Sequence, residues 1–227
     1  MKFNYTKHEI KLFKQLNSPK KIQDFLNKLR FNFETQAETC FSPRRVMKNR
    51  TAHCMEGAML ASAVLEFHGA KPLVMDLRST LKDFDHVVAV FKQFGCFGAI
   101  SKTNHAVLRY REPIYGTLRE LALSYFHEYF LDTGEKTLRE YSELLDLRGF
   151  DNNLSAPPVA GHLPKLGENY KGEAINWRTT ERDLFFIPEH LDKIKHYKIL
   201  SSAQIKNLRK ADKIEIKAGQ LIEIRNN

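Results

Sequence analysis

The chain of 227 residues is 42% hydrophobic and 28% charged, a composition typical of a soluble globular protein that can bury a sizeable core. No apolar run approaches the roughly 20 residues that a membrane span needs, and the N-terminus carries no apolar stretch typical of a secretory signal. The three cysteines, Cys40, Cys54 and Cys96, have no CxxC spacing. This disfavours a disulfide framework or a zinc finger and predicts a reducing, cytoplasmic setting.

The net charge of +9 comes from basic residues spread along the chain, with modest concentrations over 193–198 and 206–217. A basic face of this kind can associate with nucleic acid. No nucleic-acid motif accompanies it, and no block of like charges is five residues long. We therefore expect a solvated basic surface and no specific nucleic-acid partner.

The first third of the chain predicts short helices. Two are expected over 9–16 and 19–30, the second with a serine N-cap and a proline at its first position, Ser18-Pro19. Residues 31–35 are ambiguous and can be extended. Ser42-Pro43 repeats the cap-and-proline signal and predicts a short helix that leads directly into the helix containing Cys54.

The stretch 50–67 predicts a central helix with a cysteine at its start. A nearly all-apolar run follows Cys54 and ends at Gly69, and a helix that is apolar on every side belongs inside a fold. With Thr51 as N-cap, Cys54 would lie in the first turn, where free N–H groups and the helix dipole favour a thiolate. The alternative is a small buried cysteine that only packs at the end of a core helix.

Strands are predicted after this helix. Residues 72–78 form a buried strand, and 86–92 is the strongest strand in the chain because it is apolar and β-branched. A tight turn over 93–96 would return the chain as an antiparallel strand over 97–101. Residues 105–110 are a further strand candidate.

The remaining segments complete a predicted α+β fold. A capping box at Thr117 opens a long amphipathic helix that ends near Gly134. We expect helix then loop over 136–150, an irregular wrap or linker over 152–172, a helix near 189–196 and a C-terminal hairpin over 213–224. The predicted organisation is a domain of residues 1–150, including the N-terminal helices, and an extension of residues 151–227 that packs on this core.

The order of a cysteine at a helix start, a strand opening with His86 and a return strand resembles the transglutaminase-like superfamily of papain-fold cysteine enzymes. The resemblance covers roughly residues 40–105, and residues 38–150 look like a group of small bacterial members of that superfamily. It implies a Cys-bearing helix packed on an antiparallel sheet, with Cys54 as nucleophile and His86 as its proton-transfer partner. The matching stretches are Ser42–Met47, the Cys54 helix, Gly69–Pro72, His86–Val90 and Phe97–Ser101.

The third catalytic position departs from this pattern. The superfamily usually has an aspartate at the end of the return strand, where this chain has Ser101. Papain-like relatives use asparagine, so Asn104 is a second candidate to orient the ring of His86. Without a carboxylate, the imidazolium formed during proton transfer has less electrostatic support. Asp85 adjoins His86, but neighbouring strand residues point to opposite faces, so we do not favour it.

Other polar residues near Cys54 have open or structural roles. His53 could line the cleft or cap the helix start. Glu56 should face elsewhere on the helix, in a structural ion pair. Gln36 could contribute to an oxyanion hole, although the backbone N–H of Cys54 is the better donor. A metal site built from Cys54, His53 and His86 has no supporting spacing.

The sequence therefore predicts a cysteine-dependent acyl-transfer enzyme in which Cys54 and His86 react and Ser101 or Asn104 orients the histidine. An amide or isopeptide hydrolase is favoured over a transglutaminase-like transferase, because hydrolysis needs no second substrate site. We expect a peptide or protein amide as substrate, no cofactor and no membrane partner. The alternative is a non-catalytic binding module on the same scaffold, which the missing carboxylate favours.

Overall fold

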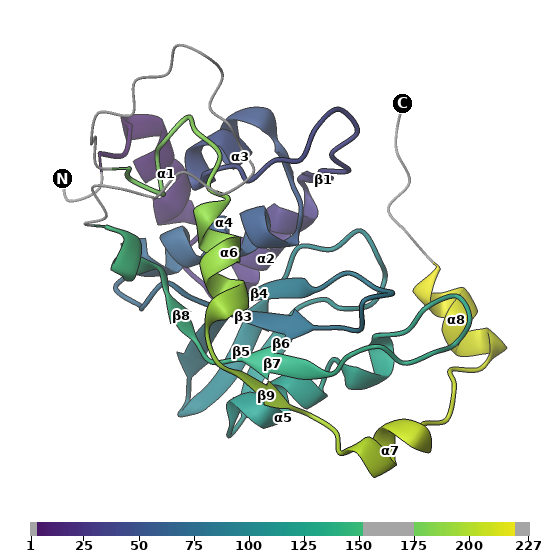
Figure 1. Cartoon of the computed structure of the whole chain (residues 1–227). Coiled ribbons are helices and arrows are strands. Elements are labelled where there is room, and N and C mark those ends of the chain that lie inside the picture. Colours follow the sequence, from purple (N-terminus) through teal and green to yellow (C-terminus); the bar gives the residue numbers. More distant parts are fainter. Residues whose placement is uncertain (1–3, 152–174, 221–227) are drawn as a thin grey trace.

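The computed structural model describes residues 4–151 and 175–220, which form the predicted α+β fold. In this part of the chain, a seven-stranded sheet has the order β6-β5-β4-β3-β7-β9, and β8 also pairs with β3 (Figure 1). All of the strand pairs of this sheet within the described residues are antiparallel. The strands are β3 (Leu73–Arg78), β4 (His86–Gln93), β5 (Cys96–Ile100), β6 (Arg111–Tyr115), β7 (Glu140–Ser142), β8 (Leu145–Asp146) and β9 (His196–Lys198).

Helices cover both faces of this sheet (Figure 1). One face carries the N-terminal helices and α6, and the other carries α5. The two C-terminal helices, α7 and α8, lie at one end of the sheet. The helices are α1 (Lys7–Gln15), α2 (Pro19–Asn27), α3 (Pro43–Asn49), α4 (Cys54–Phe67), α5 (Leu118–Leu123), α6 (Phe186–Lys193), α7 (Ser202–Lys206) and α8 (Lys213–Gly219).

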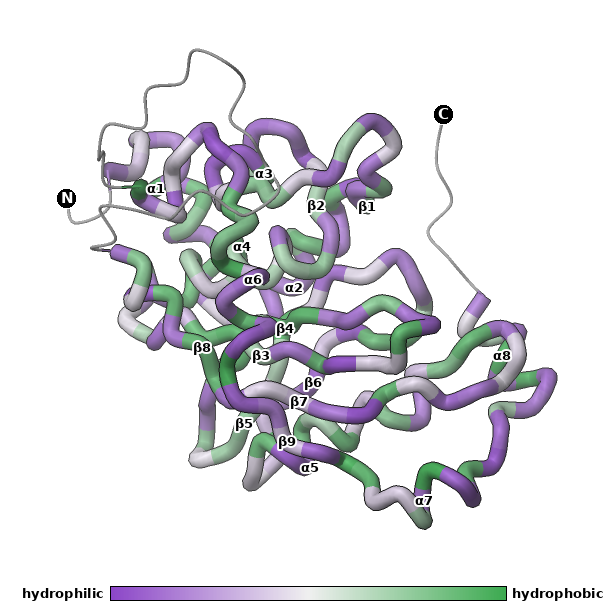
Figure 2. Tube along the Cα trace, viewed as in Figure 1, coloured by the Kyte–Doolittle hydropathy of each residue, from purple (hydrophilic) through white to green (hydrophobic). Residues whose placement is uncertain are grey.

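Helix α4 is the central helix that the sequence predicts. Every residue from Met55 to Leu65 is buried, and the helix packs against β4. Figure 2 shows the largely hydrophobic trace of α4 next to the polar N-terminal helices. At Gly57, an added Cβ would lie 2.5 Å from the Cβ of Lys102, so only glycine lets α4 approach the segment after β5 this closely.

Strand β4 is buried on both faces, which explains its continuous apolar sequence. Val87, Ala89 and Phe91 belong to the core around α4. Val88 and Val90 belong to the second core, on the α5 side of the sheet. Because His86 is the first residue of this strand, the sheet holds its backbone rigidly.

The predicted start of the Cys54 helix needs one correction. Thr51 is not its N-cap, because it lies in β2 (Thr51–Ala52), which pairs in parallel with β1 (Arg30–Phe31). The N-cap is His53, and the side chain of Glu56 accepts a hydrogen bond from its backbone N–H at 2.9 Å. The caps at Ser18 and Ser42 are confirmed.

The predicted β4–β5 hairpin is confirmed, with Phe94 and Gly95 at positive φ in its two-residue turn. The strand predicted over 105–110 is wrong. These residues form a loop in which Leu108 has a φ of 60° and its N–H donates to Glu128, and the next strand is β6.

The helix predicted from Thr117 to about Gly134 is too long. Its capping box is confirmed, but α5 ends at Leu123. The hydroxyl of Ser124 donates to the Leu121 carbonyl, and Arg111 donates to both the hydroxyl and the carbonyl of Ser124. These bonds occupy groups that the next helical turn would need.

The helix predicted over 136–150 is also wrong, because this segment pairs with β3. Tyr141 of β7 lies opposite Leu77, and Leu145 of β8 lies opposite Val74. A short 3-10 helix, Leu147–Phe150, follows. The open edge of β3 thus decides the conformation of this segment, and nothing local in the sequence signals that edge.

Among the described residues of the C-terminal extension, Ile187 and Leu191 belong to the core around α4, and β9 pairs with β7. The hairpin predicted there is wrong over 213–219. This segment is α8, and its N-cap Asp212 accepts from the backbone N–H groups of Ile214 and Glu215. The predicted helix near 189–196 is found as α6. Residues 221–224 and the segment 152–172, predicted to be an irregular wrap or linker, lie outside the described residues. Arg178 forms a buried two-point ion pair with Glu66 of α4, at 2.6 and 2.8 Å.

No helix among the described residues has the length and apolar character needed to cross a membrane.

Candidate active site

Cys54 and His86, the predicted reacting pair, lie together at the start of α4. Cys54 is the first residue of this helix and is half-buried. Its thiol is within hydrogen-bonding reach of His86 and also of His53. The thiol therefore has an imidazole on each of two sides, where the sequence predicts one.

The His86 ring is held by a hydrogen-bond chain whose direction is fixed. A carbonyl oxygen can only accept, so the Ser101 hydroxyl must donate its single proton to the Leu108 carbonyl, at 2.6 Å. The Ser101 oxygen then accepts from Nε2–H of His86, at 2.7 Å. This leaves Nδ1 as the unprotonated nitrogen of the neutral ring, available to take a proton from Cys54.

Ser101 itself is positioned by a glutamine from α2. The Gln23 side chain accepts from the Ser101 N–H at 2.9 Å and donates to the Ser101 carbonyl at 2.8 Å. Its amide nitrogen also donates to Asn27. Both Gln23 and Ser101 are buried, so these bonds fix the end of β5 away from competing water.

Among the described residues, the other two candidates for orienting His86 form no hydrogen bond with its ring. Asn104 is half-buried, and its side chain forms no hydrogen bond within residues 4–151 and 175–220. Asp85 instead accepts from the backbone N–H of Ser79 at 2.7 Å and from its hydroxyl at 3.1 Å. Of the sequence-predicted residues, the structure thus brings together Cys54, His86 and Ser101.

The second imidazole, His53, is fixed by the loop before α3 and by α4. Its Nε2 lies 3.0 Å from the Thr39 carbonyl, which requires a proton on that nitrogen. The same nitrogen is 3.4 Å from a carboxylate oxygen of Glu56 and 3.9 Å from Glu34. Its Nδ1 is therefore left for the thiol of Cys54.

Glu56 is the carboxylate that the sequence reading assigned to a separate ion pair. It is fully buried, and it accepts from the hydroxyl of Thr39, the backbone N–H groups of Phe41 and His53, and the amide of Asn32. The signal that could have located it is the spacing His53-x-x-Glu56. This spacing matches a capping box only once the helix is started at Cys54.

These contacts shift the pKa values at the site. Burial of the Cys54 thiol raises its pKa, but hydrogen bonds from His53 and His86 and the charges of both rings outweigh burial and hold the pKa well below its usual value. Burial lowers the pKa of His53, but its hydrogen bond to Cys54 and the charge of Glu56 prevail and raise it to about 9. Burial raises the pKa of Cys40 well above its ordinary value, so Cys40 is a packed thiol.

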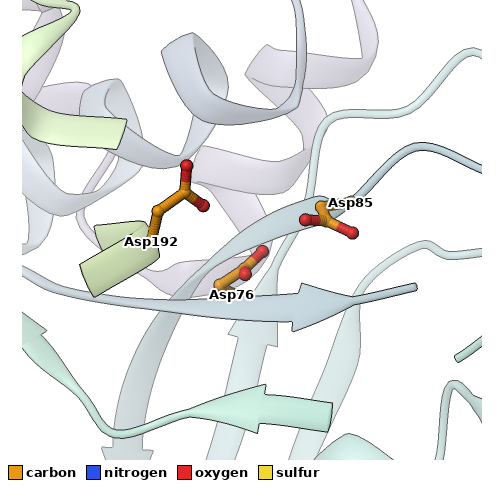
Figure 3. Close-up of side chains that lie close together, drawn as sticks. All are labelled: Asp76, Asp85 and Asp192. Carbon is orange, nitrogen blue, oxygen red and sulfur yellow. The ribbon is translucent and has the colours of Figure 1, made fainter. Parts of the chain in front are cut away.

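A separate acidic cluster has metal-ligand spacing. Carboxylate oxygens of Asp76, Asp85 and Asp192 lie within 4.8 Å of one another, from β3, the residue before β4 and α6 (Figure 3). Oxygen donors of this kind suit Mg²⁺ or Ca²⁺. His196 is 3.1 Å from Asp76 and Arg78 is 3.5 Å from Asp192, so other side chains already contact two of the three carboxylates. Among the described residues, Cys54 and its two histidines do not form such a group.

The groups around Cys54 can carry out nucleophilic chemistry at a carbonyl. A thiol whose pKa is lowered can act as a nucleophile, and His86 lies where it can exchange a proton with it. The first turn of α4 has backbone N–H groups without helical partners, which can stabilise an oxyanion. Gln36, the other donor considered from sequence, is an exposed loop residue.

No protein-family model matches the chain, and no curated protein matches it either. Function is therefore inferred from the residues of the site and their arrangement.

Proposed function

We propose that this protein is a cysteine-dependent acyl-transfer enzyme, acting as an amide or isopeptide hydrolase or as a transglutaminase-like transferase. The observation that carries the proposal is the fixed hydrogen-bond chain from the Leu108 carbonyl through Ser101 to His86, which leaves the second ring nitrogen for Cys54. A structural cysteine needs no oriented base. A cysteine nucleophile needs one that can hold its proton and later return it.

The proposed reaction passes through a thioester. The thiol proton moves to His86, the sulfur bonds to the substrate carbonyl carbon, and the C–N bond breaks as the nitrogen takes the proton from His86. Water then gives a proton to His86 while its oxygen bonds to the acyl carbon. The C–S bond breaks and returns the thiolate. An amine in place of water gives transfer instead of hydrolysis.

Ser101 takes the place of the acidic or amide residue in this proposal. Its oxygen accepts from His86 as an aspartate would, but it is neutral and gives weaker support to the imidazolium. A papain-like core and membership of the transglutaminase-like superfamily are proposed with the activity. The α+β fold and the cysteine on the central helix support them. Three free cysteines support a reducing compartment such as the cytoplasm.

An active-site acylation experiment tests the proposal. p-Nitrophenyl acetate is added to the full chain, and mass spectrometry locates the acetyl group, with hydroxylamine as acceptor to measure turnover. We expect acetyl on Cys54, turnover in the wild type, and neither in Cys54→Ala. Cys96→Ser is the matched control and should behave as wild type, because Cys96 lies on β5 away from the relay. Equal acetylation of Cys54 and Cys96 would contradict the proposal.

The second candidate is a non-catalytic module that binds peptides on the same scaffold. The neutral Ser101 in place of a carboxylate favours it. Alkylation by iodoacetamide separates the two. An enzyme should be alkylated at Cys54 faster at neutral pH than an unfolded thiol, whereas a binding module has no reason to be. Peptides with amide and isopeptide bonds can then be screened for cleavage or binding.

A further inference from the structure

The Cys54 thiol contacts a second histidine, His53, which has its own neighbouring carboxylate. His53 immediately precedes Cys54 and contacts its thiol, and Glu56 lies one helical turn further on. The predicted activity does not require either residue. Their arrangement nevertheless has the parts that the His86 side lacks, namely a buried carboxylate next to an imidazole.

The position of His53 is strongly fixed. As N-cap residue of α4 it cannot move without disturbing the helix start, and its ring is only 16% exposed. The Thr39 carbonyl, at 3.0 Å, holds one ring nitrogen in the protonated form. The ring can therefore exchange a proton only at the nitrogen that faces Cys54.

Glu56 makes His53 a stable cation. Four hydrogen-bond donors hold the fully buried carboxylate, an arrangement that stabilises a negative charge on it. Its nearest charged neighbour is the His53 ring, at 3.4 Å. The other titratable groups facing this ring are Glu34, at 3.9 Å, and Cys54 itself.

We propose that His53 is a second catalytic histidine, which stays protonated through the reaction and donates Nδ1–H to the Cys54 sulfur, with Glu56 as its positioning residue. This inference rests on the proposed acyl-transfer function. It divides the work between two rings: His53 holds the thiolate, and His86 moves the proton to the leaving nitrogen and back from water.

The proton and charge balance of each step is kept. When the thioester forms, His86 gives up its proton and the thiolate charge disappears, while the Glu56–His53 pair is unchanged. When water attacks, His86 regains a proton and the thiolate returns between two imidazolium rings. The carboxylic acid product releases its proton to solvent.

The experiment measures the alkylation rate of Cys54 by iodoacetamide as a function of pH, in a Cys96→Ser background so that one accessible thiol remains. The variants are His53→Gln, His86→Gln and, as the matched control, His8→Gln on the exposed surface of α1. Glutamine at position 53 can still donate to the Thr39 carbonyl. We expect His53→Gln to move the midpoint of the profile upward by about one pH unit or more, a tenfold smaller thiolate fraction at acidic pH.

A midpoint in His53→Gln equal to that of His8→Gln would overturn the inference. Acetylation of wild-type Cys54 is measured in parallel. If Cys54 is acetylated but His53→Gln does not shift the midpoint, only the proposed role of His53 is rejected. If wild-type Cys54 is not acetylated, the proposed acyl-transfer function is rejected as well. A steady-state assay should also give a lower kcat with little change in KM for His53→Gln.

A second measurement needs no substitution at His53. The protein is labelled with ¹⁵N-histidine and observed by NMR. The ring whose nitrogen signals move when Cys54 is alkylated, and whose signals are still present in His86→Gln, is that of His53. At pH 7.5 both nitrogens of that ring should have the chemical shifts of an imidazolium. Shifts of a neutral imidazole would overturn the inference even if His53→Gln failed to fold.

Discussion

The two sides of the Cys54 thiol are built differently. On one side, His86 is oriented by a hydroxyl, and the chain of hydrogen bonds ends on a backbone carbonyl. On the other side, His53 is oriented by a buried carboxylate. A neutral partner leaves an imidazole free to gain and lose a proton, whereas a buried carboxylate keeps it charged. The site therefore does contain a buried carboxylate, that of Glu56, although the residue that orients His86 is a serine.

The two sides also differ in how they are anchored. His53 and Glu56 lie three residues apart, on the helix that carries the nucleophile. The His86 side is built from three separate elements, namely β4, the end of β5 and α2. Gln23 and Ser101, which hold each other there, are 78 positions apart in the sequence. Substitutions at His53 or Glu56 should therefore change mainly the charge around the thiol. Substitutions in the His86 relay should change the position and orientation of its ring.

The largest effect separates the two histidines. His86→Gln removes the proton carrier and should lower kcat/KM for an acyl substrate by about 10²–10⁴. His53→Gln keeps the carrier and should lower it by about tenfold, since a single stabilising contact with the thiolate is lost. Initial rates with p-nitrophenyl acetate measure both, with His8→Gln as control. A larger loss in His53→Gln than in His86→Gln would reverse the roles assigned to the two rings.

The second prediction concerns the hydroxyl of Ser101. Ser101→Ala leaves His86 without its acceptor and should lower kcat/KM by about 10–10², the effect of losing a group that orients a catalytic base. Ser101→Asp should not raise the activity above that of the wild type, although it introduces the aspartate usual in the transglutaminase-like superfamily. A carboxylate has no proton for the Leu108 carbonyl, which is 2.6 Å from the serine oxygen and would repel it.

The Ser101 pair of variants is read from steady-state rates and from the thermal unfolding midpoint of each protein. Ser101→Thr, which keeps the hydroxyl, is the conservative control. Activity in Ser101→Asp above the wild type would mean that the serine is only a weakened aspartate and that the Leu108 carbonyl is not part of the relay.

The third prediction tests the anchor of the His86 side. Gln23→Glu keeps the acceptor for the Ser101 N–H but brings a carboxylate oxygen to the Ser101 carbonyl, where an N–H donated at 2.8 Å. We expect a loss of about 1–3 kcal/mol in the free energy of unfolding, because a buried carbonyl is left without its donor. Urea unfolding measures it, and Lys20→Gln on the exposed side of α2 is the control. The alkylation profile of Cys54 should change less than in His53→Gln.

The sequence predicts the parts of the site that follow from local pattern. The apolar run after Cys54 identifies the central helix, and the β-branched run from His86 identifies the strand that meets it. Ser101 is found because it stands at the end of the return strand. Sequence preference alone predicts Thr51 as N-cap, because threonine caps helices more readily than histidine. This shift in the helix start hid the pairing of His53 with Glu56.

The rest of the structure depends on contacts between distant segments. Residues 140–142 and 145–146 form strands because β3 has an open edge there, and α5 ends early because Arg111 donates to the Ser124 carbonyl. The alternation of Ile214, Glu215 and Ile216 reads as a strand, but the Asp212 cap starts a helix instead. No local pattern could have predicted that Gln23 holds Ser101.

The fourth prediction uses pH to sharpen the contrast. The pKa of His53 is raised to about 9 in the folded chain, so its contribution to stability is present in full below about 6.5, its unfolded value, and is lost as pH rises through 9. His53→Gln should therefore be less stable than wild type by about 1–3 kcal/mol at pH 6.5, and this difference should vanish by pH 10. Urea unfolding at the two pH values measures it. A difference that grows with pH would contradict a charged His53.

The smallest expected effect is that of Asp85→Asn. Asp85 precedes His86 in the chain, and an orienting role for it would give the His86 side a carboxylate after all. Its oxygen instead accepts from the N–H and hydroxyl of Ser79, and asparagine keeps an oxygen for both bonds. We expect kcat/KM to change by less than about twofold, within the range of surface substitutions, and the midpoint pH of Cys54 alkylation to stay the same. Asp85 also faces Asp76 and Asp192, so losing its charge removes repulsion and should not weaken the fold. A tenfold fall in activity would show that Asp85 supports His86 during the reaction. Both histidines would then have a carboxylate, and the two would differ only in how far that carboxylate lies from the ring.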